Sequence, residues 1–128
     1  MCVADAFSDE AVLAIDDAAT EIRKRTGTWA ASGLLVGPVT WHEAYSAPPL
    51  IVSDRDEVLT PDSVGVTIGE ESGPYARVVL YHYGWVDLDI VNWYTGDVSA
   101  TSGTPIRSVE GFGSFLDDVH VRLIAERP

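Results

Sequence analysis

Apolar residues recur at helical spacing near the beginning of the chain. The stripe consists of Val12, Ile15, Ala19 and Ile22. Such spacing places side chains on one face of a helix, and we predict a helix from about Ser8 to Arg25. Ser8 is a suitable N-cap and Gly27 a suitable stop signal. The cations Arg23, Lys24 and Arg25 would then lie in the last turn, where they favour the helix dipole, so we interpret them as helix capping rather than as a binding patch.

A second helical pattern lies near the end of the chain. We predict a helix from Ser114 to about Glu126, with Ser114 as N-cap and Asp117 three residues later in a capping-box arrangement. Its buried stripe would consist of Phe115, Leu116, Val119 and Leu123. The preceding Gly111-Phe112-Gly113 lacks the lysine and the further glycines of a phosphate-binding loop. We therefore interpret it as a flexible approach to the helix.

Between the two helices the pattern favours strands. Alternating apolar and polar residues from Ser63 to Gly69 predict a half-buried strand. Further strands are predicted at Gly33–Trp41, where Pro38 suits an edge or a bulge, and at Leu50–Val52. Ser53–Glu57 is predicted to be a loop or one helical turn, and Glu70–Pro74 a turn.

The strongest strand signal extends from Tyr75 to Tyr94, where β-branched and aromatic residues dominate. We predict two antiparallel strands that turn near Tyr83 and Gly84, or one long strand with a bulge at the glycine. Thr95-Gly96-Asp97 then predicts a turn into a short strand, Val98–Thr101.

Together these elements predict one α+β domain over residues 1–128, since this length suits a single core. We expect an antiparallel sheet of about five to six strands, flanked by an N-terminal and a C-terminal helix. Two amphipathic helices can cover one face of such a sheet and leave the other for solvent or a partner.

Charge narrows the choice of partner. The net charge is -12 at pH 7 and the sequence pI is about 4.3, so nucleic acids and anionic membranes are poor partners and a basic protein fits better. Solubility or salt adaptation alone could also explain this charge. Residues 38–100 contain only Arg55 and Arg77 as cations, against ten acids, a net of -8: Glu43, Asp54, Asp56, Glu57, Asp62, Glu70, Glu71, Asp87, Asp89 and Asp97.

The strand from Trp85 to Trp93 carries the candidate partner-binding residues. Alternation sends Val86, Leu88 and Ile90 to one face and Trp85, Asp87, Asp89 and Trp93 to the other. Carboxylates beside indoles can pair with Lys or Arg while the rings anchor a partner. We add Glu70 and Glu71, from the preceding turn, to this predicted surface. Alternatively, the tryptophans cover a sheet edge and the aspartates are simply solvated.

Self-sufficient catalytic or metal-binding motifs are missing from the sequence. Cys2 is the only cysteine, and the three histidines follow no metal-ligand spacing. We therefore expect no cofactor, metal site or catalytic residue. An alternative function is that of a small cone-shaped α+β enzyme, hydrolase or isomerase, or a ligand-binding protein, whose pocket would be lined by Tyr81, His82, Tyr83 and Asp87. A weaker alternative is a mimic of nucleic acid, which would need regularly spaced carboxylates.

The stretch Gly84–Asp89, the turn Thr95–Val98 and the helix from Ser114 resemble the C-terminal half of small acidic immunity proteins from actinobacterial polymorphic-toxin systems. The resemblance covers roughly the last 45 residues and contains no diagnostic motif. It implies a cytoplasmic inhibitor that binds one cognate toxin domain tightly and blocks its active site or substrate cleft. A cytoplasmic location also agrees with residues 1–9, which show no secretion signal.

Overall fold

The computed structural model describes residues 14–43, 50–70 and 73–126, and it confirms the predicted α+β fold. A seven-stranded antiparallel sheet has the order β3-β2-β4-β5-β6-β7, and β1 pairs with β4 beside this path. In chain order the elements are α2 (Ile15–Ala31), β1 (Leu35–Val36), β2 (Thr40–Glu43), β3 (Leu50–Val52), a 3₁₀ turn η1 (Arg55–Glu57), β4 (Pro61–Gly69), β5 (Pro74–Tyr81), β6 (Trp85–Asn92), β7 (Val98–Pro105) and α3 (Val109–Ala125).

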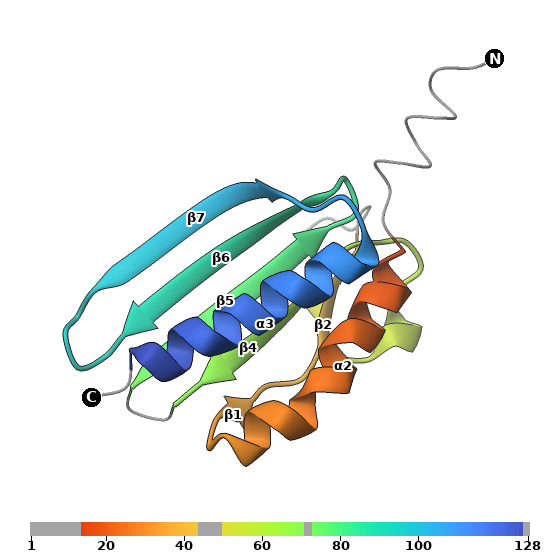
Figure 1. Ribbon diagram of the computed structural model, residues 1–128. Helices are drawn as coiled ribbons and strands as arrows, with labels where there is room; N and C mark the ends of the chain where they lie inside the picture. The colour runs from red at the N-terminus through yellow and green to blue at the C-terminus, as the bar shows by residue number, and fades with distance from the viewer. Residues whose placement is uncertain (1–13, 44–49, 71–72, 127–128) are drawn as a thin grey trace.

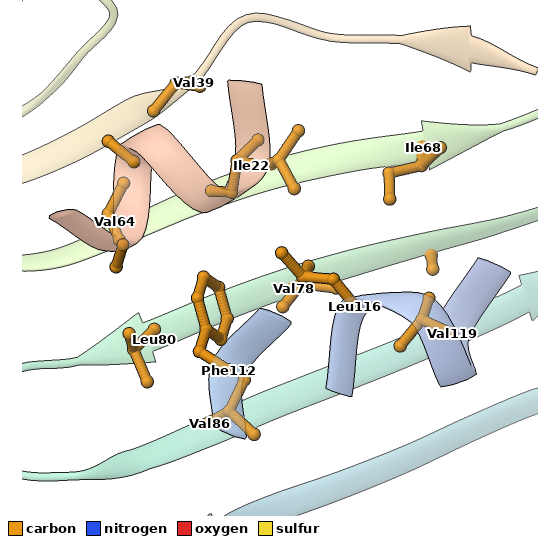
Figure 2. Packing of buried hydrophobic residues seen from close by; sticks show 14 of the residues in the cluster. Ile22, Val39, Val64, Ile68, Val78, Leu80, Val86, Phe112, Leu116 and Val119 are labelled. Carbon is orange, nitrogen blue, oxygen red and sulfur yellow. The ribbon is translucent and has the colours of Figure 1, made fainter. Parts of the chain in front are cut away.

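Both helices lie across the same face of the sheet (Figure 1). Figure 2 shows how Phe112 and Leu116 of α3 and Ile22 of α2 meet side chains from the strands, among them Val64, Val78, Leu80 and Val86. All of these residues are fully buried. No helix of the described residues covers the opposite face, which carries Arg77, Val79, Asp87 and Asp89. We call this opposite face the open face.

The strand predictions hold in position, while several strand lengths differ: β4, for example, begins at Pro61 rather than at Ser63. The hairpin from β5 to β6 turns at Gly84, whose φ of 97° is accessible mainly to glycine. The segment Gly33–Trp41 forms two strands, β1 before Pro38 and β2 after it. Both strands pair with β4. β7 continues to Pro105, beyond its predicted end at Thr101. The predicted helical turn at Ser53–Glu57 is present as η1.

The first helix ends later in the sequence than predicted, at Ala31 rather than at about Arg25. Ile15, Ala19 and Ile22 are buried as predicted, whereas Ser8 and Val12 lie outside the described residues. The helix continues through Gly27 because Trp29, two residues later, is buried in the core. Its stop signal is Gly33, with φ 86°. Leu34 N donates to Trp29 O at 3.1 Å and Gly33 N to Ala30 O at 3.0 Å, which is a Schellman motif.

The three cations of this helix therefore lie in its interior and do not cap it. Lys24 pairs with Glu21 at 2.7 Å, and the guanidinium of Arg23 lies 5.4 Å from the centroid of the Trp41 ring. Arg25 contacts Glu21 at 3.1 Å and Asp117 of α3 at 2.7 Å. The prediction that this triplet is no binding patch remains untested, but its side chains contact the chain itself.

The second helix begins earlier than predicted. Ser108 is the N-cap, and its Oγ accepts a hydrogen bond from Gly111 N at 2.9 Å, whereas Ser114 is exposed inside the helix. Gly111, Phe112 and Gly113 thus form helical turns rather than a flexible approach. The glycine at 113 has a packing reason, because a Cβ there would lie 2.7 Å from Arg25 Nη2 and 2.8 Å from Glu21 Oε1. A side chain would displace the ion pairs that join the two helices.

Candidate functional site

Strand register orders the open face into rows, since residues opposite each other on antiparallel strands point to the same side. Two outer rows are mainly apolar and aromatic, and the rows between them are mainly polar. One outer row runs Leu35, Gly69, Tyr75, Val91 and Val98. The other runs Ile51, His42, Ser63, Tyr81, Trp85 and Pro105. The inner rows contain Thr67, Arg77, Asp89 and Ala100, and Thr40, Gly65, Val79 and Asp87.

Trp85 belongs to an aromatic cluster at one end of the open face. Its ring stacks on Tyr83 with centroids 5.1 Å apart and lies 5.7 Å from the ring of Tyr81. The indole remains 37% exposed. These rings hold one another in place, so a partner would meet a partly ordered aromatic surface.

Trp93 forms a second cluster roughly 25 Å away, the length of strand β6. Its ring stacks on Tyr75 with centroids 5.7 Å apart, and the side chain is 60% exposed. Beside it lies a hollow of about 250 Å³, which we call the Trp93 hollow. It is lined by Leu35, Gly37, Thr67, Gly69, Glu70, Tyr75 and Trp93.

The two aspartates between these clusters differ in their surroundings. Asp89 lies opposite Arg77 of β5, so a cation shares its part of the face. Asp87 lies where the register between β6 and β7 shifts, and its Oδ1 accepts a hydrogen bond from Gly103 N at 2.9 Å. Burial, together with the nearby carboxylate of Asp87, raises the pKa of Tyr81. Asp87 therefore has a role in the fold, while Asp89 has none that the described contacts reveal.

The other candidate acids are placed only in part. Glu70 follows directly after β4 and lines the Trp93 hollow, whereas Glu71 lies outside the described residues. The structure thus brings Glu70 next to Trp93, which are 23 positions apart in the sequence. Trp85, Asp87 and Asp89 share the open face as predicted, and both indoles are accessible.

The residues of the alternative enzyme pocket lie near the β5–β6 turn, and none of them lines the Trp93 hollow. Tyr81 and Asp87 lie on the open face, while His82 and Tyr83 occupy the β5–β6 turn with ring centroids 4.0 Å apart. On the side covered by helices, the space is filled by core residues such as Phe112 and Leu116 (Figure 2). Among the described residues, no three His, Cys, Asp or Glu side chains are grouped as a metal site would require.

Sequence reasoning missed the contribution of β5 to this surface. Ala76, Val78 and Leu80 are buried, so the intervening Tyr75, Arg77, Val79 and Tyr81 point to the open face. The same alternation that identified Trp85 and Asp89 could have identified Tyr75 and Tyr81. The pairing of Leu35 and Glu70 with Trp93 depends on strand order, which the pattern alone does not give.

Comparisons with known proteins add no relative to this description. The chain matches no protein-family model, no curated protein and no solved structure. Within the described ranges, neither helix has the length and hydropathy needed to cross a bilayer. Any functional conclusion therefore depends on the geometry of the open face.

Proposed function

We propose that this chain is an immunity-type inhibitor, which binds a basic toxin domain through the open face of its sheet and neutralises it in the cytoplasm. The observation that carries this proposal is the exposure of Trp85 and Trp93 on a sheet face that no described helix covers, with Asp87 and Asp89 between them. Exposed indoles are the side chains that most often dominate a protein interface.

The distribution of exposed apolar residues supports a docking surface more than a merely soluble one. Leu35, Ile51, Trp85 and Val98 are exposed large hydrophobic residues at open-face positions. On the two described helices, by contrast, Val121 is the single exposed large hydrophobic residue. Charge for solubility alone would not require apolar residues to gather on one face.

The mixture of rows also favours a protein partner over mimicry of nucleic acid. A mimic needs carboxylates at regular, phosphate-like spacing. Here two outer rows, mainly apolar and aromatic, flank two inner rows that are mainly polar, and Arg77 lies opposite Asp89. Such a surface fits a protein with cationic and apolar groups side by side.

The proposal is tested by looking next to this gene for a reading frame that ends in a basic C-terminal domain, and by producing that domain together with this chain. We expect a stable complex that suppresses the toxicity of that domain. Trp85→Ala and Trp93→Ala should each weaken binding by about thirty-fold if the indoles act as interface anchors. Val121→Ala is the control, because Val121 is an exposed apolar residue on the helical side.

Two results would contradict the proposal. One is a complex that tolerates both tryptophan substitutions but is weakened by Val121→Ala, because binding would then use the helices. The other is that this chain gives no protection against any basic domain encoded by the neighbouring genes. Circular dichroism of each variant would show that the fold is retained.

A further inference from the structure

The Trp93 hollow combines a volume of about 250 Å³ with two aromatic rings and a carboxylate at its lining. The absence of side chains at Gly37 and Gly69 leaves the space open, and Tyr75 and Trp93 stack beside it. Its volume of about 250 Å³ is smaller than that of typical small-molecule sites, which is about 300–1,000 Å³. A single long side chain fits this size better than a free metabolite.

Glu70 supplies the charge. Its Oε2 lies 2.7 Å and Tyr94 Cε2 lies 3.2 Å from the position that a Cβ at Gly73 would take. The carboxylate therefore lies close to Gly73, and the ring of Tyr94 approaches the same glycine. A negative group at the edge of an aromatic hollow favours a cation whose body can lie against the rings.

We infer that the Trp93 hollow holds an arginine side chain of the protein partner, with the guanidinium against the Trp93–Tyr75 rings and within reach of Glu70. This inference rests on the proposed function and names the group that this part of the surface recognises. Arginine is favoured over lysine because its planar guanidinium stacks on aromatic faces and loses less hydration. The net charge of -12 adds a long-range attraction for such a group.

The test uses the isolated chain and a small probe, so that it does not depend on finding the toxin. N-acetyl-arginine amide is titrated into ¹⁵N-labelled protein, and the four indole N–H signals are followed by NMR. We expect the Trp93 signal to shift and saturate with a dissociation constant on the order of 10 mM. The Trp85 signal is the internal control on the same face, and Trp29 and Trp41, both buried, report whether the fold is intact.

The probes and variants separate charge from shape. N-acetyl-citrulline amide has nearly the same shape without the charge and should shift Trp93 much less. Glu70→Gln should weaken the arginine probe by roughly fivefold. Asp89→Asn removes the same charge from the same face outside the hollow and should have little effect. Thr67→Phe fills the hollow without changing charge and should also weaken binding.

Three outcomes would overturn the inference: no saturable shift at Trp93, equal shifts with citrulline, or equal sensitivity to Glu70→Gln and Asp89→Asn. Failure of the proposed function leaves a different signature. In that case the probe would still bind at Trp93, while the intact chain would give no protection against the toxin domain.

Discussion

Gly69 lies at a very close approach between β4 and β5 and lines the Trp93 hollow. A Cβ at this position would clash with Tyr75 Cβ and with Tyr75 Cα. Because the second atom belongs to the backbone, the strand itself would have to shift. We expect Gly69→Ala to lower the free energy of unfolding by about 1–3 kcal/mol and to move the Trp93 indole signal, as measured by urea denaturation and NMR.

Gly27 provides a control of opposite sign. It lies inside α2, and a Cβ there would have no atom within 4 Å. Gly27→Ala should raise the free energy of unfolding by about 0.5–1 kcal/mol, because alanine restricts the unfolded chain and favours a helix. Equal effects of the two substitutions would show that packing against Tyr75 does not make Gly69 necessary.

At the scale of single residues, the alternation of apolar and polar positions predicted correctly which face of the sheet each residue lies on, but not which contacts the residue makes. It placed Asp87 and Asp89 on the same face as Trp85, and the structure agrees. It treated the two aspartates as equivalent, because the bulge opposite Gly103 arises from a shift in strand pairing that has no local signal. Nor did it relate Tyr75 to Trp93, since that contact requires the order of the strands.

At the scale of elements, helix α3 offers a direct test of its corrected beginning. Ser108→Ala removes the oxygen that accepts from Gly111 N, and should lower the free energy of unfolding by about 1 kcal/mol. Ser114→Ala changes an exposed position inside the helix, where alanine is the better helix former, and should be neutral or slightly stabilising. Thermal unfolding of both variants measures the difference. The reverse ranking would restore Ser114 as the cap.

The contact between the helices should depend on pH. The hydrogen bond from Arg25 holds the pKa of Asp117 below its usual value of 3.8. A carboxylate with a lowered pKa adds stability that is fully present above the unfolded pKa and is lost as pH falls through the folded one. The Asp117 side chain is 62% exposed, so solvent limits the coupling with Arg25 to about 0.2–1 kcal/mol.

A double-mutant cycle with Arg25→Ala and Asp117→Asn measures this coupling by urea denaturation at several pH values. We expect a constant coupling near neutral pH and a decline once pH falls below 3.8. A coupling that is absent near neutral pH, or that persists in strong acid, would contradict the assignment. Glu21 also contacts Arg25, and it is unchanged throughout the cycle.

Elements were easier to predict than their ends. The buried stripes Ile15–Ile22 and Leu116–Leu123 follow from period alone, because the core accepts one face of each helix. The ends depend on tertiary contacts. Trp29 extends α2 past Gly27 because its ring is buried, and Gly113 is tolerated in α3 because the Arg25 and Glu21 side chains need the space.

At the scale of the whole molecule, the acidic residues divide into those that serve the fold and those left to act at a distance. Glu43 Oε2 accepts from Leu59 N and Thr60 N at 2.8 and 3.1 Å, and Asp62 lies 2.7 Å from His42 Nδ1. Asp54 and Asp87 also accept backbone hydrogen bonds. Charge counts in the sequence therefore overstate how many carboxylates are available to a partner, although the sign of the field is unchanged.

This division decides which substitution best tests the electrostatic part of the proposed function. Asp89→Lys reverses a charge on the open face and breaks no hydrogen bond among the described contacts, unlike a change at Asp87. Asp118→Lys makes the same change in net charge on the exposed side of α3.

If attraction is focused on the open face, Asp89→Lys should slow association with the toxin domain several-fold at low salt, and Asp118→Lys much less. The difference should disappear near 1 M salt, where the screening length is about 3 Å. Stopped-flow measurements across a salt series would show this, whereas equal slowing by both variants would mean that only net charge matters and that the partner binds elsewhere.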